Sequence, residues 1–248
     1  MLNISLRAET IFYIGTWPVT NAVLLAFIVF MILAVISITL RRKLAMVPGG
    51  LQNIFEAVLE GGLGMMDTVL GSRERSEKYL PIVFTIFLFV LFSNWMGLVP
   101  GVTSITVGHG ADAVPLLRSP ASDLNFTLAL ALIAVTMVNV FGTAAMGLKH
   151  RASVFFNFRS PIGFFVGILE LLSEFARIIS FTFRLFGNVF AGEVLLAIMA
   201  LLAPYLVPLP FMFLEIFVGF IQAFIFGMLT LVFVALATTP HEGEDAGH

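Results

Sequence analysis

The sequence contains no cysteine and few charged residues. Without cysteine, disulfides, thiolate metal sites and cysteine nucleophiles are all excluded. Charged residues make up 11% of the chain, against roughly 25% in soluble domains, while hydrophobic residues reach 59%. A net charge of −2 gives no basis for nucleic-acid binding. The composition therefore predicts an all-α integral membrane protein with no soluble domain of any size.

Long apolar runs organise the chain as a single membrane domain over residues 1–248. The runs 19–40, 79–100 and 124–148 are each long enough to cross the ~30 Å hydrocarbon core as a helix. Segment 51–70 instead carries Glu56, Glu60 and Asp67 on one helical face. This pattern is typical of an amphipathic helix that lies in the membrane interface.

The C-terminal third contains two longer apolar segments, 162–202 and 211–239, separated by a break with three prolines. As one helix, 162–202 would be about 61 Å long, twice the thickness of the hydrocarbon core. Two spans with a turn near 173–180 are the other possibility, but 168–186 offers no glycine or proline for a turn. We therefore favour one tilted helix, which forms a long hairpin with 211–239 and brings the total to about five transmembrane helices.

Basic residues lie on alternate connections between these segments. They cluster at 41–43, 73–78 and 149–159, whereas the loop 101–123 contains only Arg118. By the positive-inside rule, the three clusters face the cytoplasm, and the loop and the N-terminus face the outside.

One charge in the long hairpin has no partner in its own helix. Arg184 has no acidic residue within one helical turn, whereas Arg177 can pair with Glu174 at i−3. Arginine does not lose its proton, and an unpaired one in a bilayer costs from a few kcal/mol to roughly 10 or more. We expect its partner on another helix, in a water-filled cavity or on another protein.

Two carboxyl groups of the hairpin also lack a basic neighbour. Glu193 and Glu215 have no basic residue at i±3 or i±4, so they must be protonated or hydrated, which makes them candidates for a proton relay. Two hydrogen-bonded structural acids are the alternative reading. The four histidines have no metal-binding spacing, and we expect neither a metal site nor a cofactor.

Several motifs resemble the a subunit of F-type ATP synthases. The most specific is RLFGN at 184–188 followed by AGE at 191–193, and QAFIF at 222–226 supports it. ELLS at 170–173 fits as well, and the segments 92–100 and 123–127 match more loosely. The resemblance extends over residues 10–239, or most of the chain.

The resemblance implies a proton-conducting stator subunit that is not catalytic on its own and that faces a rotating ring of c subunits. Arg184 would face the carboxylates of that ring, and Gln222 would hydrogen-bond Arg184. Two half-channels would be lined by Glu193, Glu215 and Asn188 on the outer side and by Glu170, Ser173 and Glu174 on the cytoplasmic side. The implied partners are the c ring and b-type peripheral-stalk subunits. The implied location is the bacterial inner membrane, with the mitochondrial inner membrane as the alternative.

One departure and one alternative accompany this interpretation. Many members of the family have a glutamate and a histidine where this chain has Glu193 and Glu215. The alternative function is a stand-alone ion-coupled secondary transporter in which Arg184 binds an anionic substrate. Such transporters usually contain internal repeats, and we find none in this sequence.

Overall fold

The computed structural model describes residues 8–42, 49–99, 101–102, 105–108, 114–148, 155, 161–203 and 206–239. These residues form six long helices, which are α1 (Asn21–Arg42), α2 (Gly50–Leu70), α3 (Arg73–Leu98), α4 (Leu124–Met146), α6 (Pro161–Leu202) and α7 (Pro208–Thr238). Five of them, all except α2, are long and apolar enough to cross a membrane. The predicted all-α membrane fold is confirmed. The basic cluster at 149–159 and the four histidines lie outside the described residues.

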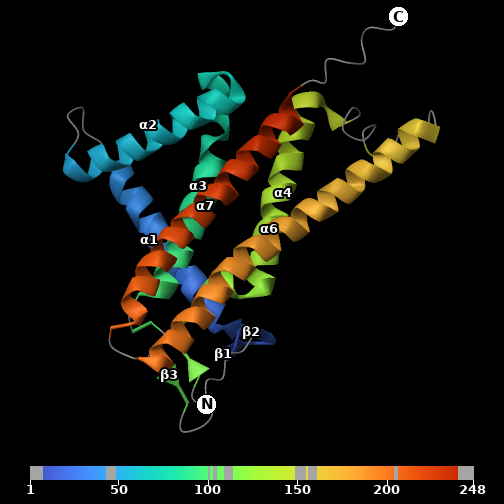
Figure 1. Ribbon diagram of the computed structural model, residues 1–248. Coiled ribbons are helices and arrows are strands. Elements are labelled where there is room, and N and C mark those ends of the chain that lie inside the picture. Colours follow the sequence, from blue (N-terminus) through green and yellow to red (C-terminus); the bar gives the residue numbers. More distant parts are fainter. Residues whose placement is uncertain are drawn as a thin grey trace, which may run out of the picture.

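Helix α6 is a single unbroken helix of 42 residues, as the lack of a glycine or proline in its middle predicts. Pro208 occupies the first turn of α7, where a missing backbone N–H costs nothing. Figure 1 shows α6 inclined across α4 and α7, so that the two C-terminal helices form the expected long, tilted hairpin.

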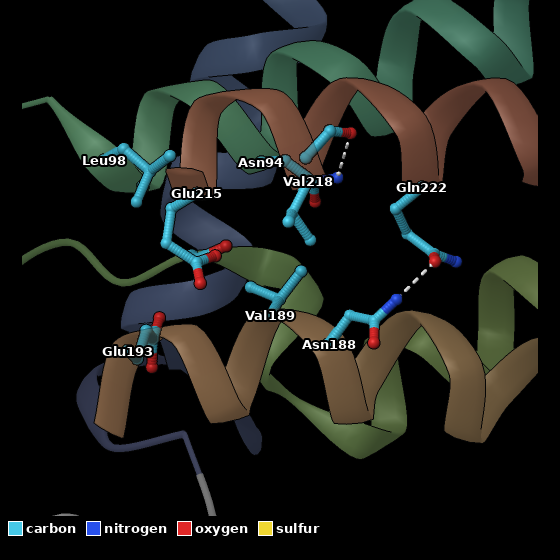
Figure 2. Close-up of a pocket in the computed structure, with 11 residues that line it drawn as sticks. Asn94, Leu98, Asn188, Val189, Glu193, Glu215, Val218 and Gln222 are labelled. Carbon is cyan, nitrogen blue, oxygen red and sulfur yellow. Dashed lines mark hydrogen bonds between the residues drawn. The ribbon is translucent and has the colours of Figure 1, made fainter. Parts of the chain in front are cut away.

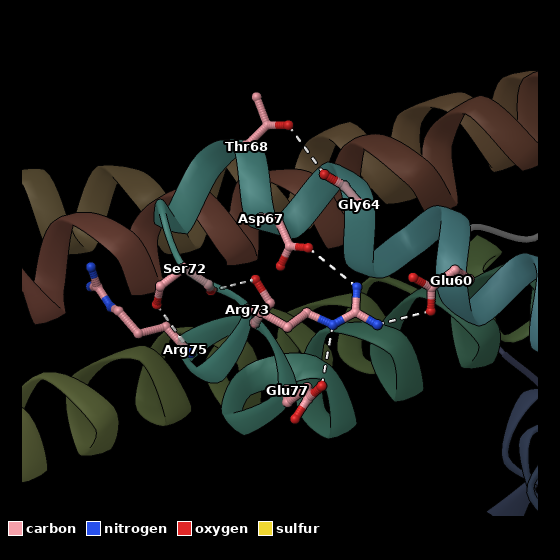
Figure 3. A network of polar contacts seen from close by, with 9 residues as sticks. Glu60, Gly64, Asp67, Thr68, Ser72, Arg73, Arg75 and Glu77 are labelled. Carbon is pink, nitrogen blue, oxygen red and sulfur yellow. Dashed lines mark hydrogen bonds and ion pairs between the residues drawn. The ribbon is translucent and has the colours of Figure 1, made fainter.

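Helix α2 lies across one end of the bundle, as an interfacial helix should (Figure 1). The residue that follows its last residue, Gly71, has a φ of 75°, which ends the helix and turns the chain into α3. Arg73 then reaches back to α2 and contacts Glu60 at 2.8 Å and Asp67 at 3.2 Å, as well as Glu77 of its own helix (Figure 3). The nearby Ser76 hydroxyl and the Arg73 guanidinium lower the pKa of Asp67.

The start of α3 differs from the expected boundary at residue 79. The helix begins at Arg73, because the Ser72 hydroxyl accepts a hydrogen bond from the Arg75 backbone N–H and caps its N-terminus. The basic residues of this region therefore belong to a solvated first part of the helix rather than to a connecting loop. Arg75 uses this position to bind the far end of α7, donating to the Thr238 hydroxyl at 2.9 Å.

Helix α7 is the centre of the bundle and packs against α3, α4 and α6. Its Phe226 is fully buried and lies 4.6 Å, between ring centroids, from Phe181 of α6. Leu185 of α6 is also fully buried in this core. The helices approach most closely at glycines: Gly142 of α4 lies against the backbone of Ala237 in α7.

Two small antiparallel hairpins were not expected from the sequence. One joins β1 (Thr10–Ile14) to β2 (Trp17–Thr20), and the other joins β3 (Thr106–Val107) to β4 (Val114–Pro115). A short 3₁₀ turn, η2 (Pro120–Ser122), leads into α4. Both hairpins lie at the end of the bundle opposite α2 (Figure 1).

The close helix contact at Gly142 yields a stability prediction. A Cβ at Gly142 would lie 2.9 Å from the Ala237 carbonyl oxygen, so Gly142→Ala should force α4 and α7 apart and cost about 1–3 kcal/mol. Gly61→Ala is the control, because a Cβ there meets nothing within 4 Å and alanine favours the helix by about 0.5–1 kcal/mol. Thermal unfolding of the purified protein measures both, and equal midpoints for the two variants would contradict the predicted packing.

Candidate functional site

Arg184 lies half-buried on α6 without a counter-charge among the described residues. Its guanidinium donates to the Ser180 hydroxyl, one turn earlier, at 2.9 Å. Arg177 is different: it pairs with Glu174 at 2.9 Å, and its guanidinium lies 4.0 Å from the centre of the Phe233 ring. The two arginines share a face of the helix, but in the part of the chain that the structure describes only Arg177 is neutralised.

An open cavity of about 310 Å³ lies beside Arg184, between α6 and the C-terminal part of α7. Its lining residues come from α6 and α7 and are Ser173, Ala176, Arg177, Ser180, Phe181, Arg184, Leu229 and Phe233. Two guanidinium groups and two hydroxyls make this wall polar enough to be hydrated. Of the residues expected on this side, Ser173 lines the cavity directly.

The two acidic residues expected with Ser173 lie differently. Glu174 binds Arg177 and also accepts from the Asn139 amide of α4 at 3.4 Å, so it ties two helices together. Glu170 is half-buried one turn before Glu174 and does not line the cavity.

A second, smaller cavity of about 20 Å³ lies between α3, α6 and α7 (Figure 2). It brings together four of the side chains that the sequence analysis singles out, Asn188, Glu193, Glu215 and Gln222. Three buried polar atoms on residues that line it have no hydrogen-bond partner among the described residues: Asn94 Oδ1, Ser119 Oγ and Gln222 Nε2. A space of this size and polarity suits one water molecule.

The two cavities lie on opposite sides of Arg184 along the axis of α6. Ser173 precedes Arg184 by eleven residues and Glu193 follows it by nine. At 1.5 Å per residue, these separations are about 16 Å and about 14 Å. Arg184 therefore stands between the two polar spaces.

Gln222 does not contact Arg184, although the sequence analysis assigns it that hydrogen bond. Gln222 is 1% exposed, and its side-chain oxygen accepts from the Asn188 amide at 2.6 Å. Asn188 lies one turn beyond Arg184, and its side chain, rather than that of Arg184, donates to Gln222. The Asn188–Gln222 bond thus closes the gap between α6 and α7 on the outer side of the arginine (Figure 2).

Glu193 has a basic partner that helical spacing could not reveal. Arg118, in the loop before η2, lies 3.5 Å from the Glu193 carboxylate and is held by the Ser122 hydroxyl at 3.0 Å. Glu193 is thus partnered by a charge 75 positions away in the sequence. The sequence did offer one indication of this contact, because Arg118 is the only arginine or lysine in the loop 101–123.

Glu215 is seated by close contacts of the helices around it. Its carboxyl group packs directly against Gly192, where an added Cβ would require the Glu215 side chain to move. Asn94 and Trp95 of α3 hold the same part of α7 by donating to the carbonyls of Gly219, at 3.1 Å, and Ile216, at 3.0 Å. These contacts fix the rotation of α7 and direct Glu215 toward α6 (Figure 2).

One face of α6 beside Arg184 consists of small, exposed side chains. At spacings of three and four residues it presents Ser173, Ala176, Ser180, Gly187 and Ala191, with Arg184 in the same row. A Cβ at Gly187 would meet nothing within 4 Å. The row is a shallow surface on which another helix could approach the arginine closely.

Comparison with known proteins agrees with the resemblance noted in the motifs. The family model described as ATP synthase A chain matches residues 22–235. The ATP synthase subunit a of Campylobacter jejuni is 36% identical over 88% of this chain and 89% of its own. That of Campylobacter concisus is 38% identical over the same shares, and that of Helicobacter pylori is 37% identical over 94% and 92%. The chain therefore belongs to the family of ATP synthase a subunits, multi-pass membrane subunits that work with the other subunits of an F-type ATP synthase.

Proposed function

We propose that this chain is the proton-conducting stator subunit of its ATP synthase and provides two offset half-channels separated by Arg184. The observation that carries the proposal is the pair of polar cavities on opposite sides of this arginine. The partners would be a rotating c ring and b-type stalk subunits, in a bacterial inner membrane. Membrane potential would drive the protons with ~2.3 kcal/mol per charge per 100 mV.

Arg184 would find its counter-charge on the ring. An unpaired guanidinium in a bilayer is costly, and a carboxylate that passes along the small-residue face of α6 would neutralise it. A protonated ring carboxyl must release its proton before it can form this ion pair. Since arginine does not give up its own proton, the same group prevents a direct leak between the two cavities.

The outer half-channel would use Glu193 and Glu215 in different ways. Arg118 neutralises Glu193, whereas Glu215 contacts no basic group among the described residues. Glu215 is therefore the member that we assign to proton exchange, and Glu193 with Arg118 forms the charged wall. Asn188 and Gln222 would connect this space with the ring side of Arg184.

The cytoplasmic half-channel would be the 310 Å³ cavity, lined by the hydroxyls of Ser173 and Ser180. Glu170 lies at its cytoplasmic end along α6 and would receive protons there. Glu174, held by Arg177 and Asn139, would border the path and keep its wall in place.

Arg184→Lys should abolish ATP-driven proton pumping while the complex still assembles. Lysine keeps the charge but loses the planar fork and can deprotonate when it is desolvated. Arg177→Lys is the matched control on the same face and should keep most activity, because lysine can still pair with Glu174. Pumping in inverted vesicles, normalised to assembled complex, measures both. Near-normal pumping by Arg184→Lys would contradict its assignment as the essential charge.

Single cysteines should separate the two half-channels by sidedness, since the parent chain contains no cysteine. The Ag⁺ ion is the reagent, because the outer cavity of about 20 Å³ admits no bulky probe. We expect Ag⁺ to inhibit pumping by the Ser173→Cys variant when it is added on the cytoplasmic side. For the Val189→Cys variant, Ag⁺ should inhibit when it is added on the outer side. Inhibition of pumping in vesicles of each orientation reports the reaction. If both cysteines react from the same side only, the two-channel arrangement is wrong.

Substitutions of Glu215 should distinguish a proton relay from a structural acid. Glu215→His keeps a titratable group and should retain pumping, while Glu215→Leu should lower it at least about tenfold. Packing alone predicts the reverse order, because leucine is apolar and close in volume to glutamate. Assembly levels and pumping in inverted vesicles are measured together. Full activity of Glu215→Leu with failure of Glu215→His would assign Glu215 to structure.

A further inference from the structure

The β1–β2 hairpin exposes a group of large apolar side chains that nothing in the described chain covers. Residues 10–20, TIFYIGTWPVT, contain no charged residue. The turn has Gly15 at φ 65°, as the first central position of a tight two-residue hairpin turn requires. At the tip, Tyr13 is 68% exposed, Ile14 65% and Trp17 79%.

A hairpin of this kind is unstable in water on its own. Two strands without a third strand or a packed face are marginal at best. Here Ile14 pairs with Trp17 and Tyr13 with Pro18, so exposed apolar side chains occupy both strands. The tip therefore needs an apolar environment from outside the chain.

The position of the hairpin indicates which environment this is. Strand β2 ends at Thr20, and α1, a membrane-spanning helix, begins at the next residue. Helix α1 continues with an exposed apolar stripe at Val23, Phe27 and Phe30. The hairpin is thus joined directly to the first residue of a lipid-facing span (Figure 1).

The backbone and the side-chain types set the depth. An open two-stranded sheet has unpaired N–H and C=O groups along its edges, which excludes it from the hydrocarbon core. Tyrosine and tryptophan, with apolar rings and a polar atom, concentrate at the headgroup level of membranes.

The base of the hairpin is firmly connected to the outer half-channel. Asn21 is fully buried, and its side chain accepts from the Glu9 backbone N–H at 3.2 Å and donates to the Pro115 carbonyl at 3.2 Å. Pro115 lies three residues before Arg118, the partner of Glu193. An interaction that fixes the position of the hairpin therefore also fixes the loop that borders the outer cavity.

We propose that the β1–β2 hairpin is a membrane-interface anchor, with Tyr13, Ile14 and Trp17 among the lipid headgroups of the outer leaflet. Through Asn21 it fixes the level of the Arg118 loop relative to the membrane surface. The proposal requires only that α1 spans the membrane. It can therefore be wrong while the two half-channels exist, and it can be right even if they do not.

Site-directed spin labelling in the assembled complex tests the depth. Trp17→Cys and Tyr13→Cys are labelled with a nitroxide, and the complex with the cysteine-free parent chain provides the background. Accessibilities to oxygen and to a water-soluble nickel chelate are compared in liposomes. We expect both labels at headgroup depth, between two reference positions: Val35→Cys, lipid-exposed in the middle of α1, and Glu74→Cys, exposed in the polar first turn of α3.

Three other outcomes would overturn the anchor. Labels at both positions that behave like Glu74→Cys would mean that the tip lies in water. Labels that are reached by neither reagent in the complex, but by oxygen in the isolated chain in liposomes, would mean that another subunit covers the hairpin. A Trp17→Cys label as deep as Val35→Cys would contradict the argument from unpaired backbone groups.

Discussion

The uncompensated charge of Arg184 is the constraint on which the rest of the arrangement depends. In a bilayer a lone guanidinium is unfavourable by at least a few kcal/mol, and the described chain offers it only the Ser180 hydroxyl. Two other charges of the hairpin are paired within the described chain: Arg177 has Glu174, and Glu193 has Arg118. Under the proposed function, Arg184 is left open for a counter-charge on another subunit.

Helix α6 is the most exposed of the five candidate spans. Only 11% of the residues in its most apolar stretch are buried, whereas 44% of the residues in the corresponding stretch of α7 are buried. Helix α7 therefore lies inside the bundle, and α6 presents an exposed face. Helix α7 contacts α6 through Glu215, whose carboxyl group lies against Gly192, and it contacts α3 at Gly219, where Asn94 and Trp95 donate to the α7 backbone.

The sequence predicted what is local, and it missed what depends on distant contacts. The apolar runs located the helices, and the absence of glycine and proline over 168–186 predicted the unbroken α6. Glu193, Glu215 and Asn188 were expected together, and they line one cavity, which Gln222 also lines. The Arg118 contact was missed, because its partner lies 75 positions away, and Gln222 was given the wrong partner because spacing cannot rank Asn188 against Arg184. The β1–β2 hairpin was also missed. The strand-forming residues of segment 10–20 are too few to be distinguished in the sequence from the apolar helix that follows them.

The difference in size between the two cavities bears on how a stator conducts without leaking. The cavity beside Arg184 is wide and open, at about 310 Å³, while the one at Glu193 and Glu215 suits a single water between buried side chains. Under the proposed function, so narrow a path would make proton entry on that side depend on a few titratable groups rather than on bulk water. Opposite Arg184, no described residue forms a wall, because the small-residue face of α6 is exposed. Under the proposed function, the ring itself would supply that wall, so the path would be complete only when a ring carboxyl stands beside the arginine.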